Sequence, residues 1–481
     1  MIIRMIAAVM GMTCVLVSLS KCDAAEKSER PNVVFILADD LGYTDLGCFG
    51  SRYYETPHLD RMAQEGMRFT SAYTCGPNCQ PTRAALMSGQ YGPRTGVYTV
   101  GSIDRFDWPS RPLQPVENVT ELPLDRVILP QGLKAGGYAT GMFGKWHLGE
   151  KGKHHPLERG FDEGFVSMGR HFDFATNPQQ EVPSGIYLAD YLTDRAVDFI
   201  ERHQEEPFFL YLPHFGVHSP WEAKPELIEK FKKKPGVGGH ERPEYAAMIA
   251  SVDESVGRIR ATLEKLKLSE RTLVIFTSDN GGVGGYRREG ILTGKEATDN
   301  APLQGGKGML YEGGIRVPYI ACQPGTIAAG MESETPVNSV DLYPTLLEVT
   351  GSAVPGEATL DGTSYAALLE GKNLEGPRPP LFWHFPGYLG ANRNTWRTTP
   401  AGAIRQGDWK LIEFFEEGRK ELFNLREDVG ERKDLASTQP EKVGELYGKL
   451  VAWRHKVGAR MPTKNLDRQP PGKKKRGGGE E

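Results

Sequence analysis

The chain has 481 residues, of which 39% are hydrophobic and 25% charged, and its formal net charge is −4. This composition is typical of a globular protein with one to three domains. The negative net charge argues against broad nucleic-acid binding, so we expect no nucleic-acid partner. The high content of Gly (57) and Pro (34) favours a loop-rich fold over a helical bundle.

The N-terminal segment has the pattern of an export signal. Arg4 precedes an apolar run at residues 5–19, and Ala25 supplies a small residue for cleavage. The run is short for a membrane span, so we predict a signal peptide over residues 1–25 and an exported protein with no stable membrane span. Lipid anchoring through Cys22 is the less favoured alternative, because a lysine precedes it where a small residue is needed.

Apolar runs alternate with helical patterns through the first three quarters of the chain. Three runs rich in β-branched and aromatic residues are typical of strands buried on both faces: residues 33–38, 208–212 and 273–276. Helical periodicity marks two of the intervening segments, residues 188–202 and 245–268. This alternation predicts an α/β fold with a largely parallel sheet, and we assign it to a domain spanning residues 26–372.

The sequence changes character after residue 372. A Pro-rich stretch leads into several short strand-like segments, at residues 381–385, 402–405, 409–414 and around 421–423. A helix is predicted from Pro440 to Val457, so residues 373–460 form a small α+β subdomain. Residues 461–481 contain lysine and glycine runs and are predicted to be disordered.

Two of the predicted strands end in acidic or amide residues. Asp39 and Asp40 follow the first strand, and Asp279 and Asn280 follow the last. Ligands of open α/β sheets bind outside the carboxyl ends of the strands, and these hard oxygen donors suit calcium or magnesium. Alternatively, each pair forms a strand-end turn, because Asp and Asn beside Gly are common turn residues.

The segment that begins at Cys79 is the most informative in the chain. A cysteine before a Pro-Thr turn and a predicted helix could be activated by the helix N-terminus, and Arg83 could hold an anion with two hydrogen bonds. Spacing alone permits a cysteine nucleophile, a structural cysteine or a redox thiol. No second Cys or His pair has zinc-site spacing, and the disulfide state of three further cysteines is not defined by the sequence: Cys48, Cys75 and Cys322.

The pentapeptide Cys79-Gln80-Pro81-Thr82-Arg83 resembles the Cys-x-Pro-Ser/Thr-Arg motif of the type I sulfatase family. Five other blocks resemble that family in the same order: residues 32–42, 56–60, 144–149, 305–318 and 341–345. The resemblance covers roughly residues 31–455. It implies an alkaline phosphatase-like α/β fold, with a large mixed, mostly parallel sheet flanked by helices and a small C-terminal subdomain of antiparallel sheet plus helix.

The resemblance also implies the chemistry. A formylglycine-generating enzyme would convert Cys79 to formylglycine, whose hydrate attacks the sulfur of a sulfate ester. One calcium ion would be held by Asp39, Asp40, Asp279, Asn280 and the modified Cys79. Arg83 would hold the hydrate, Lys145 and His147 would lie beside the nucleophile, His218 would face the leaving group, Lys307 would reach the sulfate oxygens, and Asp279 would assist the attack.

Export and a polar composition suit a sulfated carbohydrate substrate, such as a sulfated galactose or N-acetylgalactosamine unit. Three alternatives remain open: a phosphomonoester or phosphonate hydrolase of the same superfamily, an inactive protein that binds sulfated glycans, and an unmodified cysteine or redox protein. His214, four residues before His218, is predicted to have a supporting or structural role.

Overall fold

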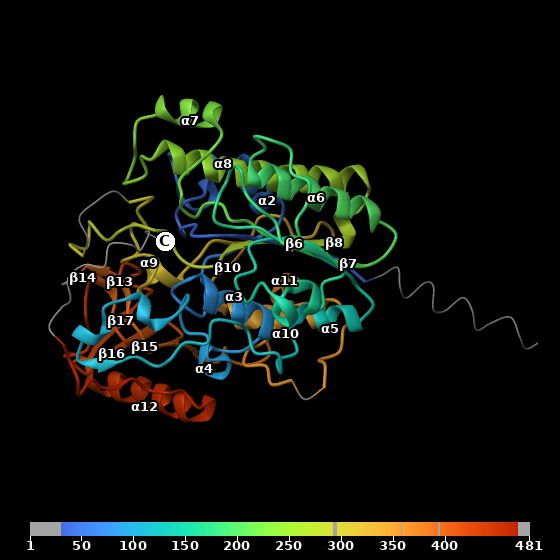
Figure 1. Ribbon diagram of the computed structural model, residues 1–481. Helices are drawn as coiled ribbons and strands as arrows, with labels where there is room; N and C mark the ends of the chain where they lie inside the picture. Colours follow the sequence, from blue (N-terminus) through green and yellow to red (C-terminus); the bar gives the residue numbers. More distant parts are fainter. Residues whose placement is uncertain (1–29, 292–295, 357, 393–394, 470–481) are drawn as a thin grey trace, which may run out of the picture.

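The computed structural model describes residues 30–291, 296–356, 358–392 and 395–469 (Figure 1). The predicted signal peptide, residues 1–25, lies outside the described residues, as does Cys22. Within the part of the chain that is described, no helix is both long and apolar enough to cross a membrane.

A sheet of eight strands forms the centre of the molecule, in the order β10-β2-β9-β8-β1-β7-β5-β6. In that order the strands span Met331–Ser333, Met67–Phe69, Tyr319–Cys322, Thr272–Ser278, Asn32–Ala38, Phe208–Pro213, Ala139–Gly144 and Glu163–Val166. The strands from β8 to β6 pair in parallel, whereas β9 is antiparallel to both of its neighbours. The large mixed, mostly parallel sheet predicted from the sequence is confirmed.

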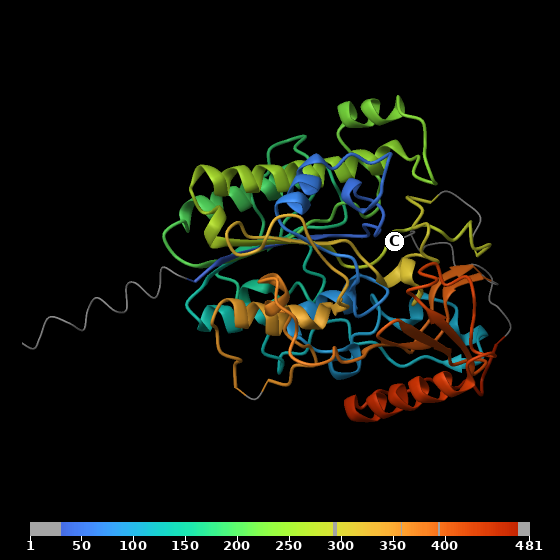
Figure 2. The same cartoon turned by 180° about the vertical axis from the view of Figure 1, so that it is seen from behind.

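Helices cover both faces of this sheet (Figures 1 and 2). On one face lie α2 (Pro57–Glu65), α6 (Leu188–Arg202) and α8 (Pro243–Lys265), with α7 (Pro225–Lys232) above α8. On the other lie α3 (Cys79–Ser88), α5 (Leu129–Ala135), α10 (Leu342–Val349) and α11 (Ala366–Leu369). Residues of β1 alternate between the two cores: Val34 and Ile36 join the first, and Val33 and Phe35 the second. Because β1 is buried on both faces, its sequence is continuously apolar.

The two helices predicted from periodicity are both present. Helix α6 has the predicted bounds, whereas α8 begins two residues earlier than predicted and ends at Lys265 instead of residue 268. The earlier end follows from the backbone, because Lys267 adopts a left-handed conformation (φ +59°) that an α-helix cannot continue.

The C-terminal subdomain is an antiparallel sheet with the order β12-β15-β16-β17 and a long helix. Its strands are Leu381–Phe385, Ala401–Gln406, Trp409–Phe414 and Arg419–Asn424, and α12 spans Pro440–Val457. Leu446 and Leu450 of α12 pack on one face of the sheet. The other face packs against Leu310 and Ile315 of the larger domain, which confirms the predicted antiparallel sheet plus helix.

The remaining α-helices and strands of the described residues are short. They are α4 (Gly92–Thr95), α9 (Glu312–Ile315), the parallel pair β3 (Ala72–Tyr73) and β11 (Val337–Asn338), the hairpin β13 (Leu389–Asn392) and β14 (Thr395–Thr398), and the antiparallel pair β4 (Leu113–Gln114) and β18 (Thr463–Lys464).

The structure differs from the predicted disordered tail over its first residues. Strand β18 pairs with β4, and the Asn465 side chain donates hydrogen bonds to the carbonyls of Pro109 (3.1 Å) and Arg111 (3.0 Å). A two-residue strand has no periodicity to detect, so composition alone set the start of the tail too early. Residues 470–481 lie outside the described residues.

A buried ionic network joins the subdomain to the larger domain. Lys410 Nζ of β16 lies 2.9 Å from Glu312 Oε1 of α9 and 2.8 Å from Glu431 Oε1, and all three side chains are fully buried. Burial alone would raise the pKa of Glu312, but Lys410, Arg316 and Arg405 lower it below its ordinary value. Glu312 is therefore charged, and the network depends on its cations.

Replacing Lys410 tests this network. Lys410→Met removes the buried lysine that Glu312 and Glu431 share and leaves Glu312 with its arginine neighbours alone. We therefore expect a loss of about 3 kcal/mol in the free energy of unfolding, measured by urea denaturation. The control Lys442→Met breaks a half-exposed pair with Glu445 and should cost less than about 1 kcal/mol. Equal losses in the two variants would show that the buried network stabilises the fold no more than a surface ion pair does.

Candidate active site

Four neighbouring parallel strands, β8, β1, β7 and β5, end at the same edge of the sheet. The segments that follow them carry most of the predicted site residues: Asp279 and Asn280 after β8, Asp39 and Asp40 after β1, His218 after β7, and Lys145 and His147 after β5. Helix α3 adds Cys79 and Arg83, and the loop before α9 adds Lys307. Four strand ends therefore contribute residues to the site, whereas the acidic residues in the sequence had indicated only two, those of β1 and β8.

The backbone at this edge is held in unusual conformations. Asp40 (φ +67°) and His147 (φ +63°) both lie in the left-handed region, which costs a non-glycine residue about 1–2 kcal/mol. Hydrogen bonds hold Asp40 there: its N–H donates to Asp279 Oδ1 (3.2 Å), and the Tyr245 hydroxyl donates to its carbonyl (3.0 Å). Strained, over-determined residues of this kind are common at functional sites.

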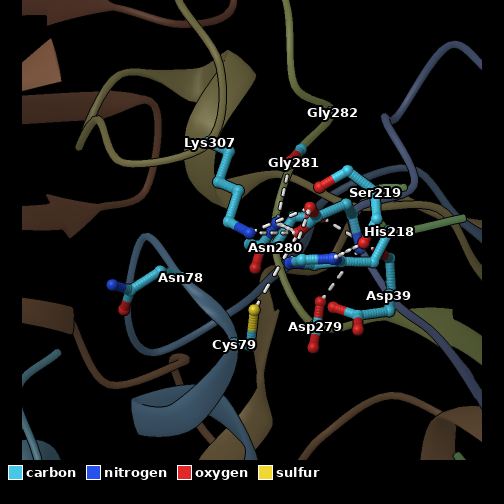
Figure 3. Close-up of polar contacts among 12 residues, drawn as sticks. Asp39, Asn78, Cys79, His218, Ser219, Asp279, Asn280, Gly281, Gly282 and Lys307 are labelled. Atoms are coloured by element: carbon cyan, nitrogen blue, oxygen red, sulfur yellow. Dashed lines mark hydrogen bonds and ion pairs between the residues drawn. The ribbon is translucent and has the colours of Figure 1, made fainter. Parts of the chain in front are cut away.

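Cys79 is the first residue of α3, and its sulfur points into the carboxylate cluster (Figure 3). Its Sγ lies 3.9 Å from Asp40 Oδ1. Burial raises the pKa of the Cys79 thiol well above its ordinary value, and the opposing effect of Lys145 and Lys307 is smaller. Burial therefore opposes the activation of Cys79 by the helix N-terminus that the sequence permits.

Three carboxylates and three cations neutralise one another in the buried site. Arg83 Nε and Nη2 donate to Asp279 Oδ2 (2.9 and 2.7 Å). Lys145 Nζ donates to Asp39 Oδ2 (2.6 Å), and Lys307 Nζ lies 2.8 Å from Asp40 Oδ1 and 2.9 Å from Oδ2.

Two of these carboxylates differ in their protonation behaviour. Burial would raise the pKa of Asp40, but Lys307, His218 and Lys145 together hold it well below its usual range. Burial and the neighbouring charge of Asp39 raise the pKa of Asp279 to about 6, against the opposing effect of Arg83.

The donor set fits a divalent cation. Oδ1 of Asp39 and Oδ1 of Asn280 are buried oxygen atoms with no hydrogen-bond partner, and Asp39 Oδ1 has only a long ion pair with Arg83 Nη2 (3.8 Å). Such buried oxygens are costly unless a closer cation or donor meets them. Ligand atoms of Asp39, Asp40, Cys79 and His218 all lie within 4.8 Å of one another, and Asn280 Nδ2 is 2.9 Å from Asp40 Oδ1. These are mainly hard oxygen donors, as calcium prefers. Because the side-chain charges already balance, a calcium ion would leave the site positive and suited to an anion.

The histidines occupy distinct positions. His218 Nδ1 donates to the Ser219 carbonyl (2.6 Å), so Nε2 faces the site, 3.8 Å from Asp40 Oδ2. Burial lowers the pKa of His218 to about 4, although Asp40 opposes this. His214 pairs instead with Ser255 Oγ of α8 (3.1 Å), outside the cluster. Nδ1 of His147 is buried without a partner, and burial lowers its pKa well below the ordinary value.

Two residues that support the site were not predicted. His171 Nε2 donates to the His218 carbonyl (2.8 Å), and the Tyr245 hydroxyl bridges the Asp40 carbonyl and Asp45 Oδ2 (2.7 Å). A single His in a loop and a Tyr within a helical pattern carry no signal in one sequence, because both are more often structural. Their contacts arise only from the folded arrangement.

Comparison with known proteins gives the family. The profile of the Sulfatase family matches residues 31–352, and that of the N-sulphoglucosamine sulphohydrolase C-terminal domain matches residues 306–454. The chain is 34% identical to a sulfatase of Formosa agariphila over 93% of each chain. It is 35% identical to the N-acetylgalactosamine-6-sulfatase of Canis lupus familiaris, over 79% of this chain and 73% of that one.

A solved structure agrees with this relationship. The fold resembles that of Ps i-CgsB in complex with k-i-k-neocarrahexaose, with a TM-score of 0.74 and 29% identity over 92% of this chain and 94% of that one. Fold and sequence together define a sulfuric ester hydrolase of the alkaline phosphatase superfamily. The chain belongs to the type I sulfatase family, as its motifs predicted.

The two hydrogen bonds that the Arg83 guanidinium donates to Asp279 can be tested by a conservative substitution. Arg83→Lys keeps the charge but cannot donate from two nitrogens to Asp279 and from a third to the Lys145 carbonyl (2.6 Å). We expect a loss of about 2 kcal/mol in unfolding free energy, measured by calorimetry. Arg94→Lys, which alters a partly exposed pair with Asp361, should cost less than about 1 kcal/mol. An unchanged unfolding free energy in Arg83→Lys would show that the hydrogen-bonding geometry of Arg83 does not stabilise the site.

Proposed function

We propose that this sulfatase hydrolyses sulfate esters of carbohydrates, on a sugar such as galactose or N-acetylgalactosamine. The observation that carries the proposal is the convergence of Cys79, three buried cations and unpartnered metal-type oxygens at one sheet edge. The carbohydrate class is supported by similarity to an N-acetylgalactosamine-6-sulfatase and to a protein solved with a neocarrahexaose. Its predicted export, with cleavage near Ala25, would bring it to such substrates.

The nucleophile in this proposal is formylglycine, made from Cys79 by a formylglycine-generating enzyme. Two features support it: the side chain points at the proposed metal ligands, and burial disfavours the thiolate form that would make an unmodified Cys79 a good nucleophile. A calcium ion held by Asp39, Asp40, Asp279, Asn280 and residue 79 would stabilise negative charge on the reacting group.

The remaining residues act on the ester itself. Lys145 and Lys307 bind the sulfate oxygens and offset their charge in a site shielded from water. Arg83 fixes the orientation of Asp279, which assists the nucleophile, and adds positive charge. A negatively charged sulfate ester beside His218 would raise its pKa from about 4, so that the protonated Nε2 donates to the departing sugar oxygen. His147 accepts the proton that is lost when sulfate is released.

Calcium binding can be measured apart from activity. Titration calorimetry on chelator-treated protein should detect one Ca2+ per chain, and Asp39→Asn or Asn280→Ala should weaken its binding by at least about tenfold. Addition of calcium should also raise the unfolding temperature of the wild type. The surface variant Asp190→Asn should behave like the wild type. Unchanged affinity in both site variants would locate the ion elsewhere.

The proton donated by His218 predicts a dependence on the leaving group. A sugar alcohol needs protonation as it leaves, whereas 4-nitrophenolate does not. His218→Gln should therefore lower kcat about 100-fold on N-acetylgalactosamine 6-sulfate or galactose 6-sulfate but less than about tenfold on 4-nitrophenyl sulfate. Equal losses would refute the assigned role. Faster turnover of 4-nitrophenyl phosphate than of any sulfate by the wild type would favour the phosphohydrolase alternative.

A further inference from the structure

A cavity of about 250 Å³ lies beside the segment that carries Lys307. Its lining includes Met309, two residues after Lys307, and the charged and aromatic side chains of Tyr311, Trp396, Arg397, Phe414, Glu417 and Arg419. Its volume approaches the lower end for ligand pockets, about 300 Å³. A larger cavity of about 390 Å³, near Pro336 and Arg378, has no lining residue from the segment that carries Lys307.

Two glycines make room for Arg397 in this cavity. A Cβ atom at Gly390 (φ +68°) would lie 2.6 Å from Arg397 Cγ, and one at Gly308 (φ +94°) would lie 3.4 Å from Arg397 Cβ. The guanidinium then stacks on Tyr286, 4.9 Å from the ring centroid. The Tyr286 hydroxyl donates to the Lys307 carbonyl (2.6 Å), so Arg397 is fixed relative to the proposed sulfate site.

The charge of Arg397 is not compensated within the described residues. No carboxylate there pairs with it, and its Nε is buried without a hydrogen-bond partner. The neighbouring arginines, by contrast, each have a carboxylate partner: Arg419 pairs with Glu421, and Arg111 pairs with Glu416. Nε1 of Trp396 is a second buried donor without a partner. A half-buried guanidinium with an unmet donor, held in a cavity, is a preorganised binding site for an anion.

We propose that Arg397 forms a second anion subsite for the saccharide, separate from the site that holds the scissile sulfate. It binds a further sulfate or a uronate carboxylate of the same saccharide, beside the Trp396 ring, which packs against Tyr388 (5.2 Å between centroids). The inference rests on the proposed carbohydrate sulfatase function and narrows its substrates to saccharides with at least two anionic groups.

Three probes test this subsite: N-acetylgalactosamine 6-sulfate, N-acetylgalactosamine 4,6-disulfate, and a uronate-containing disaccharide that carries one 6-sulfate. Arg397→Met should lower kcat/KM on one or both of the doubly anionic probes by about tenfold or more, and change it less than about threefold on the monosulfate. Whichever probe is affected identifies the anion as sulfate or carboxylate. The control Arg426→Met removes an exposed arginine that pairs with Asp408 and does not line the cavity, and it should not discriminate between the probes.

Equal losses on all three probes, or no loss on any, would overturn the subsite. If Arg397→Met does not fold, Arg397→Lys provides the same comparison. Lysine keeps the positive charge but lacks the planar guanidinium, so we expect a smaller loss of kcat/KM on the doubly anionic probes. If the wild type hydrolyses none of the probes, the proposed function fails, and binding to Cys79→Ala decides the subsite separately. Calorimetry should then show that Cys79→Ala/Arg397→Met binds a doubly anionic probe more weakly than Cys79→Ala alone. Equal binding by the two variants would overturn the proposed subsite.

Discussion

The structure depends on the mutual neutralisation of buried charges at one edge of its central sheet. Parallel strands bring Asp39, Asp40 and Asp279 together, and like charges so close are tolerated only because each meets a cation. The cations come from other elements, a helix, a strand end and a loop, so the cluster also fixes how those elements meet. Balanced in this way, the site would become positive on binding the proposed divalent ion, which would favour a sulfate ester.

The C-terminal subdomain belongs to this arrangement. The loop that carries Lys307 leads into α9, whose Glu312 is held by Lys410 of the subdomain sheet. Arg397 of the same subdomain reaches back to Tyr286 and, through it, to the Lys307 carbonyl. The family profile that covers the C-terminal region begins at residue 306 and so includes this loop, upstream of the boundary that we predict near residue 372. The proposed anion subsite and the positioning of Lys307 therefore both depend on this subdomain.

Much of this could be predicted from the sequence, because the signals are local. Continuous apolar runs identified β1, β7 and β8, periodicity identified α6, and the strand-end rule brought Asp40 and Asp279 to one place. The cations could be assigned only through family resemblance, since no spacing links Lys145 to Asp39. Supporting contacts such as that of His171, and the surroundings of Arg397, arise from residues far apart in the chain, which a single sequence does not reveal.

The central claim is that residue 79 is a formylglycine, and the mass of the tryptic peptide 69–83 from active enzyme tests it most directly. This peptide also contains Cys75, which is not in the motif and serves as an internal control for alkylation. We predict a mass about 18 Da below that of the unmodified peptide, one alkylated cysteine at Cys75, and reaction of residue 79 with an aldehyde reagent. Two alkylated cysteines in fully active enzyme would contradict the account.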